Sequence, residues 1–301
     1  MKNPEPVVKW AGGKRQLLDR IIGRAPAQYD HYFEPFLGGG AVLFNLQPPK
    51  MTVNDINAAL MSLYQRIQID PEGIIDAVNT IDGALPREKE SASKYFYTLR
   101  SRYNDLIRKQ DYGLESDALM LFLNKHCFNG LYRVNAKGEF NVPYNGSTAP
   151  SLNEDNIYAV SRMLQGATLL NVDFEQACRD AGRGDFVFLD SPYAPIKADS
   201  FQDYTKEGFH KEDHERLAVL FKDLDKRGCF VMLTNHDTRL IRELYKDYRI
   251  DVVSVRRAIN SDASKCRGTE VIVTNYLGAP AGKASERHGF SMRYLQKNRT
   301  Q

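Results

Sequence analysis

Short apolar runs rich in β-branched and aromatic residues recur along the chain, each bounded by glycine or polar residues. Near-continuous runs such as FVFL and FVML are typical of strands that are buried on both faces of a parallel sheet. Runs of this kind predict strands at 31–37, 51–55, 167–172, 185–190, 229–235, 248–255 and 270–276. Helical patterns lie between many of them, at 13–24, 56–68, 211–227 and 237–247. The alternation predicts a doubly wound α/β sheet.

The stretch from 57 to 165 interrupts this alternation. It is mostly helical in pattern, with predicted helices at 72–80, 88–110 and 115–127. The run LYRVNAKGEFNVPYNG (131–146) follows, and its NAKGE segment has turn chemistry between two β-capable stretches, which predicts a hairpin. We therefore expect a core domain (1–56 and 166–276), an inserted, mainly helical domain (57–165) and a basic, loosely ordered tail (277–301).

Composition and charge narrow the class of protein. Hydrophobic residues make up 42% and charged residues 26% of the chain, which is ordinary for a globular protein. The opening MKNPEPVVKW lacks the apolar core of a secretory signal. We therefore expect a cytoplasmic protein with no membrane partner. The four cysteines form no CxxC pair, which argues against disulfides and a zinc ribbon. Basic residues mixed with aromatic and amide side chains gather at 97–108, 125–137 and 256–267. Such mixtures suit either a phosphate-tracking surface or ordinary solvated faces.

A glycine-rich turn, FLGGG (36–40), follows the first predicted strand and opens a helix-like segment. Glycines at such a turn let the backbone bend sharply and let a ligand approach closely. Asp55 ends the next strand, where a carboxylate can accept ribose hydroxyl protons or can instead cap the following helix. Phe36, Gly38 and Gly40 of the turn, together with Asp55, are therefore candidate cofactor contacts.

Two other nucleotide-binding motifs do not fit. GGGAVL lacks the third glycine of the GxGxxG pattern that dinucleotide-dependent dehydrogenases carry, and AGGKR (11–15) lacks the spacing of a P-loop. The chain's only tryptophan, Trp10, stands near Lys14 and two glycines. This segment is compatible with a loop that closes over a charged cofactor and with a structural anchor, and the pattern does not decide between them.

The tetrapeptide Asp190-Ser191-Pro192-Tyr193 directly follows a buried-type strand, at the edge where open α/β sheets bind ligands. The Asp190 carboxylate and the Ser191 carbonyl could accept both hydrogens of an aromatic amine such as the exocyclic nitrogen of adenine, and so stabilise the charge that develops when its lone pair attacks. Tyr193 offers a face for base stacking, and Pro192 fixes the backbone. In isolation, the same tetrapeptide fits an ordinary turn.

The motifs are more specific as an ordered set. They are KWAGGK (9–14), FEPFLGGGAV (33–42), NDIN (54–57), FNGLYRVNAKGEFNVPY (128–144), DSPY (190–193), TNHDT (234–238) and RAIN…RGTEVIVTNY (257–276). Over residues 7–276 this set closely resembles the DNA adenine methylase (Dam) family, the α-group N6-adenine methyltransferases. The resemblance implies a Rossmann-like methyltransferase with a mixed sheet. It also implies that the inserted helical segment and its β-hairpin recognise DNA.

The resemblance assigns roles to individual residues. It implies that Trp10, Lys14, Asp55 and Asp190 bind S-adenosylmethionine. It implies methylation of adenine N6 in double-stranded DNA, within GATC, after the base flips out of the helix. The residues it places on DNA are Lys9, Phe128, Asn129, Leu131, Arg133, Asn135 and Pro143. Arg133 has independent support, because a guanidinium is the commonest bidentate reader of guanine.

The chain departs from the family at one catalytic position, since Ser191 stands where the family usually has proline. The role implied there is a backbone carbonyl, which serine also provides, so we expect activity without the restriction that proline imposes on φ.

Other interpretations compete with the methyltransferase. His210 and His214 are spaced as a metal pair, but the pattern favours solvent-facing histidines on a capped helix, and we expect no metal. An RNA or protein-amide methyltransferase could use the same tetrapeptide, and a DNA-binding regulator could carry a degenerate site. A cognate restriction endonuclease acting separately is compatible with the sequence, which says nothing of oligomeric state.

Overall fold

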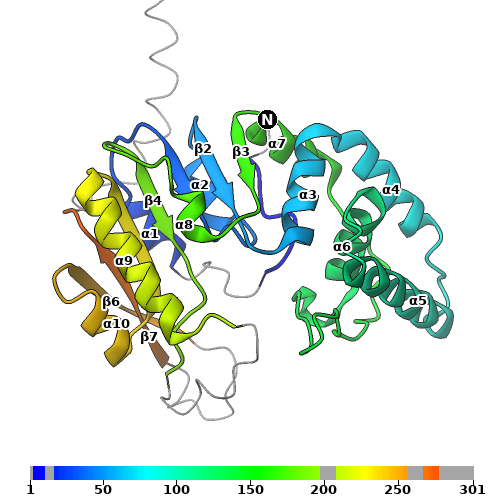
Figure 1. Ribbon diagram of the computed structural model, residues 1–301. Helices are drawn as coiled ribbons and strands as arrows, with labels where there is room; N and C mark the ends of the chain where they lie inside the picture. The colour runs from blue at the N-terminus through cyan, green and yellow to red at the C-terminus, as the bar shows by residue number, and fades with distance from the viewer. Residues whose placement is uncertain (1–2, 11–16, 197–207, 257–266, 278–301) are drawn as a thin grey trace, which may run out of the picture.

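The computed structural model describes residues 3–10, 17–196, 208–256 and 267–277 (Figure 1). It contains one mixed sheet with the strand order β3-β2-β1-β4-β5-β7-β6. Its strands are β1 (Tyr32–Glu34), β2 (Met51–Asn54), β3 (Ala167–Leu170), β4 (Phe186–Leu189), β5 (Phe230–His236), β6 (Arg249–Arg256) and β7 (Arg267–Thr274). Each strand overlaps one of the runs predicted from the sequence, so the prediction of an α/β mixed sheet is confirmed.

Helices fill the connections between these strands. They are α1 (Leu18–Arg24), α2 (Ala41–Leu46), α3 (Ala58–Ile69), α4 (Pro71–Gly83), α5 (Lys89–Arg108), α6 (Leu114–His126), the 3-10 turn η1 (Phe128–Gly130), α7 (Glu154–Leu164), α8 (Phe174–Ala177), α9 (Lys211–Arg227) and α10 (Arg239–Leu244). The predicted helices match α1, α3 to α6, α9 and α10 to within a few residues over the described chain. Neither α7 nor α8 was predicted as a separate element.

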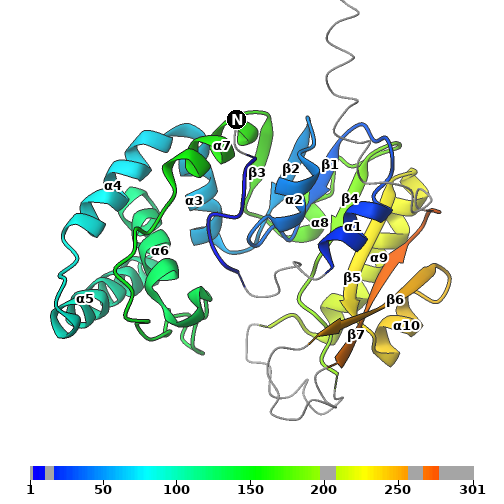
Figure 2. The ribbon, with the colours of Figure 1, turned by 180° about the vertical axis from the view of Figure 1, so that it is seen from behind.

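Side chains alternate between the two faces of the sheet, as strand geometry requires. In β4, Phe186 and Phe188 join the core shared with α1, α2 and α3, whereas Val187 and Leu189 join the core under α8, α9 and α10. Figures 1 and 2 show these helices on opposite faces. Burial on both faces explains why β4 and β5 are continuous apolar runs in the sequence.

The order of the strands reverses next to β1. The chain leaves β1 for β2 and β3 on one side, and β4 and β5 lie on the other, all five running parallel. Phe33 pairs with Val187, so β1 and β4 end close together at one edge of the sheet. Open α/β sheets bind ligands outside the carboxyl ends of their strands at such a reversal.

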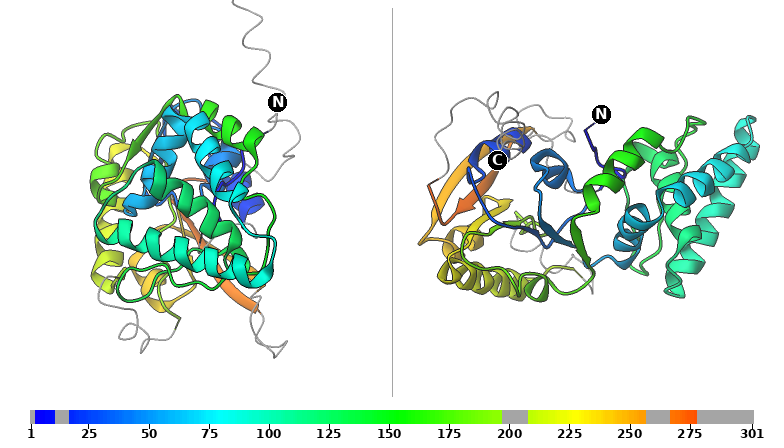
Figure 3. Two further views of the ribbon diagram at one scale, coloured as in Figure 1. Left: turned by 90° about the vertical axis from the view of Figure 1, so that its right-hand side faces the viewer. Right: turned by 90° about the horizontal axis from the view of Figure 1, so that it is seen from above.

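Helices α4, α5 and α6 project from the side of the sheet (Figures 1 and 3). They share one continuous buried cluster with the sheet, because α3 contributes residues such as Leu60 and Tyr64 that connect the two parts. The packing is therefore unbroken between the core and the inserted segment.

The predicted hairpin is only partly regular. Two isolated antiparallel bridges, Cys127–Tyr144 and Val134–Phe140, join its arms, and the residues from 128 to 146, all of them described, form no continuous strand. The NAKGE turn is present as expected, with the Asn135 amide donating to the Glu139 carbonyl at 2.9 Å. The β-hairpin prediction is thus right about the fold-back of the chain and wrong about a strand ladder.

The N-terminal segment runs between the sheet and the projecting helices (Figure 2). Asn156 of α7 exchanges two hydrogen bonds with the backbone of Glu5, both at 2.9 Å. Asn124 of α6 does the same with Lys9, at 2.8 and 3.0 Å. These two amides fix the segment that leads into Trp10.

Asp117 is buried inside the helical part, and its burial yields a stability prediction. Desolvation raises the pKa of Asp117 to about 6, although Ser62 and the Arg66 guanidinium 3.7 Å away partly oppose it. A carboxyl whose folded pKa is raised contributes stability below its unfolded pKa, and that contribution is lost as the pH rises through the folded value. We expect Asp117→Asn to raise the free energy of unfolding above pH 6 by up to about 3 kcal/mol.

Urea unfolding at pH 4 and pH 8 measures this effect. The gain should be larger at pH 8, and Asp76→Asn, an exposed substitution on the neighbouring helix α4, should show no such pH dependence. An equal or smaller gain at pH 8 than at pH 4 would contradict the expectation.

Candidate active site

The glycine-rich turn follows β1 at the edge where the strand order reverses. Gly38 has φ +49°, and a Cβ there would lie 3.0 Å from Cδ1 of Trp10. Gly40 has φ +69°, and a Cβ there would lie 2.8 Å from Cε2 of Phe44. Larger residues would be strained at both positions and would press on Trp10 and Phe44, so the path of this turn requires glycine.

Asp55 lies directly behind this turn, after β2. Its carboxylate accepts hydrogen bonds from the Gly38 amide and the Asn57 amide, each at 2.9 Å. Burial raises the pKa of Asp55, while these two hydrogen bonds act to lower it. The neighbouring Ile56 is 75% exposed, an apolar side chain beside a held carboxylate. In the sequence Ile56 had no role beyond its place in NDIN, because the pattern does not show that this isoleucine is exposed.

Trp10 packs between the glycine turn and the hairpin. Its ring stacks on Tyr132, with the ring centroids 4.6 Å apart and an interplanar angle of 13°. The same ring also lies against Gly38 of the glycine-rich turn. Tyr132 is held in turn by a 3.0 Å hydrogen bond to the Tyr103 hydroxyl. Trp10 is thus both packed and adjacent to the candidate cofactor turn. Lys14 lies outside the described residues.

Phe36 belongs to an aromatic cluster on the same edge. Its ring lies 5.4 Å from Phe174, which follows β3, and 5.9 Å from Phe209, which precedes α9. Phe209 also contacts His214, which is buried with a pKa lowered to about 4 by desolvation. The expectation that His214 faces solvent is therefore wrong, because α9 turns that side chain toward the aromatic cluster.

The tetrapeptide from Asp190 to Tyr193 lies at the carboxyl end of β4, beside this edge. Asp190 accepts a 2.6 Å hydrogen bond from the Thr234 hydroxyl of β5. Ser191 is 2% exposed, and its hydroxyl lies 3.5 Å from the Asn235 amide nitrogen. Pro192 is exposed and Tyr193 is half-buried. The loop is therefore supported from below by the adjacent strand.

The end of β5 holds this loop more firmly than the sequence indicated. Asn235 is fully buried, and its side-chain oxygen accepts the Ala194 amide at 2.8 Å. The ring of His236 lies 4.8 Å from that of Tyr193, and its Nδ1 donates to the Ala194 carbonyl at 2.8 Å. In the sequence Thr234, Asn235 and His236 belong to the TNHDT motif, and none of them was assigned a role. Their position at the carboxyl end of the strand after DSPY was the available signal.

Tyr193 is also held from β7. Its hydroxyl donates to Glu270 at 3.0 Å. Desolvation raises the pKa of Tyr193 strongly, and the charges of Asp190 and Glu270 act in the same direction. The phenol is therefore neutral and serves as a hydrogen-bond donor. Glu270 was not singled out from the sequence, because its partner is more than seventy residues away along the chain.

The residues expected on DNA cluster around η1 and the hairpin. Phe128 is 59% exposed although its backbone amide is bonded to the Pro143 carbonyl at 2.8 Å. Asn129 adopts φ +59°, a left-handed conformation that asparagine tolerates. Leu131 and Arg133 are exposed on the same arm. Phe128 and Leu131 are thus both exposed large apolar side chains on this turn and the arm that follows it.

Three further residues of this set differ in their surroundings. The side chain of Lys9 lies against Gly130, and Pro143 is exposed, so both border the Phe128 turn. The side chain of Asn135 is engaged within the hairpin turn, accepting from the Lys137 and Glu139 amides at 2.9 and 3.1 Å. Its side-chain nitrogen also donates to the Glu139 carboxylate at 3.1 Å. Asn135 therefore has a structural task in the turn.

Two further observations bear on the class of protein. Within the described ranges, no group of three or more histidine, cysteine, aspartate or glutamate side chains could hold a metal ion. Among the described helices, none combines the length and the apolar character that crossing a bilayer requires.

Comparison with known proteins decides the family. The sequence profile described as D12 class N6 adenine-specific DNA methyltransferase matches residues 10–259, from Trp10 past the described end of β6. The chain belongs to this family. It is therefore an adenine-specific DNA methyltransferase, and the family implies S-adenosylmethionine as its methyl donor.

Individual relatives agree over most of the chain. The type II methyltransferase M1.LlaDCHI of Lactococcus lactis subsp. cremoris is 41% identical over 280 residues, which cover 91% of this chain and 96% of that protein. The type II methyltransferase M.MjaIII of Methanocaldococcus jannaschii is 37% identical over 287 residues, covering 90% and 99%. A DNA adenine methylase of Serratia marcescens is 34% identical over 262 residues, covering 86% and 94%. These matches favour the DNA adenine methyltransferase over the regulator and the RNA or protein-amide enzyme.

The serine at position 191 leads to a prediction about this D12 methyltransferase. We expect Ser191→Pro to retain or raise turnover, because the hydroxyl contact at 3.5 Å is weak and proline would stiffen the loop. Steady-state methylation of a DNA duplex measures it. Ser191→Ala is the matched control, since it removes the hydroxyl without restricting φ. A severe loss in the proline variant alone would mean that the loop has a backbone geometry that proline cannot adopt.

Proposed function

We propose that this methyltransferase modifies the N6 atom of adenine within GATC in double-stranded DNA, after flipping the base out of the helix. One observation carries the proposal. The Asp190 loop, the glycine turn at Gly38 and the Asp55 carboxylate all lie at the carboxyl ends of the neighbouring strands β4, β1 and β2. A methyl donor and an acceptor base can therefore meet at one edge of the sheet.

The residues at this edge fit S-adenosylmethionine. The Gly38 turn packs so closely on Trp10 that only glycine fits there, and Asp55 offers carboxylate oxygens to the ribose hydroxyls. Phe36 and Ile56 supply apolar surface for the adenine ring, and Trp10 borders the turn. When bound, S-adenosylmethionine supplies an electrophilic methyl group on sulfur. By resemblance, Lys14 and Asp190 complete its contacts.

The tetrapeptide supplies the chemistry on the acceptor base. The Asp190 carboxylate and the Ser191 carbonyl accept the two N6 hydrogens, which frees the nitrogen lone pair from conjugation with the ring. The Thr234 hydroxyl donates to one carboxylate oxygen of Asp190 at 2.6 Å. Because the carboxylate is rigid and planar, this bond also orients its second oxygen. Tyr193, held by Glu270 and His236, stacks on the flipped base, and Pro192 restricts the loop. The transfer would form the N–CH₃ bond as the S–CH₃ bond breaks, leave the sulfur as a neutral thioether, and pass one N6 proton to solvent by way of the Asp190 carboxylate.

Target recognition falls to the inserted segment, 57–165, and its hairpin. Phe128 and Asn129 fill the gap left by the flipped base, and Arg133 reads a guanine through O6 and N7. Leu131, Pro143 and Lys9 contact neighbouring base pairs. The shared exposure of these side chains around one kinked turn supports this assignment. Asn135, whose amide is used within the turn, contributes by holding the hairpin in shape.

Modified-base sequencing of DNA from cells that express the protein tests the proposal. We expect N6-methyladenine at GATC, and resistance of that DNA to an endonuclease that cuts only unmethylated GATC. Methylation of adenine at another sequence would refute GATC as the target and leave the proposed reaction standing. No N6-methyladenine with purified enzyme, duplex DNA and labelled cofactor would overturn the proposed reaction itself.

A companion enzyme is part of the same proposal. Two relatives are named type II methyltransferases, a class that protects DNA from a separate restriction endonuclease. We therefore propose that this methyltransferase acts beside a cognate endonuclease of the same target sequence. DNA modified by the protein should resist that endonuclease, and unmodified DNA should not.

A further inference from the structure

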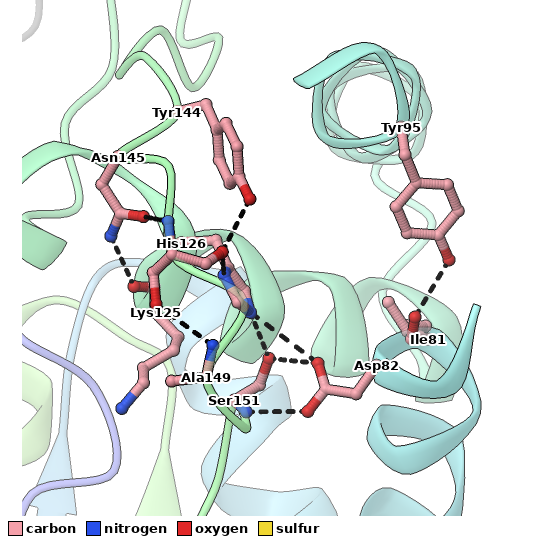
Figure 4. A network of polar contacts seen from close by, with 10 residues as sticks. Ile81, Asp82, Tyr95, Lys125, His126, Tyr144, Asn145, Ala149 and Ser151 are labelled. Atoms are coloured by element: carbon pink, nitrogen blue, oxygen red, sulfur yellow. Dashed lines mark hydrogen bonds and ion pairs between the residues drawn. The ribbon is translucent and has the colours of Figure 1, made fainter. Parts of the chain in front are cut away.

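A partly buried polar network lies at the base of the hairpin, around the side chain of His126 (Figure 4). His126, the last residue of α6, is 0% exposed. Its Nδ1 lies 2.8 Å from the Ser147 carbonyl, and because a carbonyl only accepts, this nitrogen carries the hydrogen. Its Nε2 lies 3.1 Å from the Ser151 hydroxyl. The two bonds link the end of α6 to the chain that returns from the hairpin.

Asp82, at the end of α4, anchors the other side of the network. The Ser151 hydroxyl donates to one Asp82 carboxylate oxygen at 2.5 Å, and the Ser151 amide donates to the other at 2.7 Å. Burial opposes ionisation of Asp82, but hydrogen bonds from His126 and Ser151 outweigh it and lower the pKa of this carboxyl. The network therefore ties α4, α6 and the segment 147–151 together around the Asp82 carboxylate.

The same point joins both arms of the hairpin. Immediately after His126 the chain enters the Phe128 turn, and the His126 carbonyl accepts the Asn145 amide of the returning arm at 2.8 Å. The Asn145 side chain donates to the carbonyls of Lys125 and Cys127, at 3.0 and 3.1 Å. Tyr144 adds a 2.6 Å bond to the Ser147 carbonyl. Figure 4 shows Asn145 at the carbonyl of Lys125, and the ring of His126 facing Ser151 and Asp82.

The hairpin needs such a base, because the described arms are joined by isolated bridges and not by a strand ladder. Side chains that read base edges must be held to within a fraction of an ångström, and exposed arms without a ladder cannot hold themselves. Asn104 of α5 fixes the far end, exchanging bonds with Phe140 at 2.8 and 3.0 Å. The near end, next to Phe128, is held by the Phe128–Pro143 backbone bond and by the bonds of Asn145, and the His126 ring fixes the returning chain beyond them at Ser147 and Ser151.

We propose that His126, fixed between Ser147 and the Asp82–Ser151 pair, is a positioning residue that sets how well the enzyme distinguishes its target from near-target DNA. The proposal rests on the proposed role of the 128–143 segment in reading DNA. His126 touches neither base nor cofactor and acts through the presentation of Phe128 and Asn129. A loosened network lets the hairpin settle on incorrect base pairs and weakens binding to the correct ones.

Three variants test the proposal. His126→Phe keeps an aromatic ring beside Phe122, which lies 4.5 Å away, and removes both hydrogen bonds. His126→Asn places a donor where Nδ1 stands and so preserves the bond to Ser147. Ser151→Ala removes the hydroxyl that lies between His126 Nε2 and Asp82, and keeps the bond from the residue 151 amide to Asp82. The matched control is His31→Phe, since the His31 ring has a single comparable hydrogen bond, to Thr52 at 2.9 Å on the sheet.

Methylation rates on a GATC duplex and on duplexes with one substituted base pair give the discrimination. For His126→Phe we expect kcat/KM on GATC to fall about tenfold, mainly through KM for DNA, and the target-to-near-target ratio to fall about tenfold. Cofactor affinity should change less than about twofold, because the network lies away from the cofactor turn. His126→Asn should recover much of the ratio, and Ser151→Ala should show an intermediate loss.

The outcomes separate this proposal from the one on which it rests. If Phe128→Ala and Arg133→Ala change the discrimination but the His126 and Ser151 variants leave it intact, the positioning role is refuted and DNA reading by the hairpin stands. If Phe128→Ala and Arg133→Ala also leave it intact, the proposed recognition segment is wrong. If His126→Phe and Ser151→Ala lose cofactor binding along with discrimination, the network stabilises the whole fold and the positioning role is refuted as well.

Discussion

We expect Asp190→Asn to slow methyl transfer about a thousandfold, with a far smaller effect on cofactor affinity. In the parent protein the Thr234 hydroxyl donates a 2.6 Å hydrogen bond to Asp190. Asparagine keeps an oxygen that can accept this bond, so the loop should hold its shape. The second carboxylate oxygen becomes an NH₂ group, which cannot accept an N6 hydrogen and is repelled by it. The substitution therefore removes the interaction that strengthens as positive charge develops on the nitrogen.

Single-turnover methylation with saturating cofactor and duplex DNA measures this effect on the chemical step. The matched control is Asp185→Asn at the opposite end of β4, where the carboxylate accepts the Gly182 amide at 2.8 Å. That change should reduce stability and leave the rate of transfer near that of the parent. A parental rate in Asp190→Asn would mean that the carboxylate does not activate the amine, and the proposed chemistry would have to be abandoned.

The second large effect is expected at the recognition hairpin. Arg133→Ala should lower kcat/KM on GATC about a hundredfold and relax the preference for guanine at one position, because a bidentate contact contributes about 1–3 kcal/mol of discrimination. Arg133 is exposed, and its Nε donates to Asn141 at 3.2 Å, which directs the guanidinium along the hairpin. Only the side chain is removed, so the fold should be unaffected.

Rates on duplexes with each base pair of GATC replaced in turn identify the position that Arg133 reads. Arg162→Ala, which removes an exposed arginine from α7, controls for the general loss of positive charge. A nonspecific phosphate contact would instead weaken all duplexes equally and reduce the salt dependence of binding. That uniform pattern would remove Arg133 from the set of base-reading residues.

The sequence determined the sheet and the place of its chemistry. β4 and β5 were recognisable because strands covered on both faces need continuous apolar side chains, and DSPY was recognisable because it follows such a strand. The glycines at 38 and 40 were recognisable because positive φ angles favour glycine. These signals are local, since each depends on the conformation or burial of a few consecutive residues.

Other parts of the site depend on contacts between residues that are distant in the sequence. Thr234, Asn235 and Glu270 support the catalytic loop from β5 and β7, and only the order of strands in the sheet brings them to Asp190 and Tyr193. The burial of His214 likewise follows from the packing of α9 on the aromatic cluster. No local sequence pattern predicts these contacts between residues that are distant along the chain.

The hairpin has some features that were evident from the sequence and others that only the tertiary structure shows. Its turn was evident from NAKGE, because the turn is closed by residues a few positions apart. Its lack of a ladder and its attachment through His126, Asp82 and Ser151 were not evident, because they arise from three separate segments of the chain. The sequence by itself therefore indicated which residues to expect at the site. The tertiary structure alone decided how they are held, because the holding groups come together only when distant segments pack.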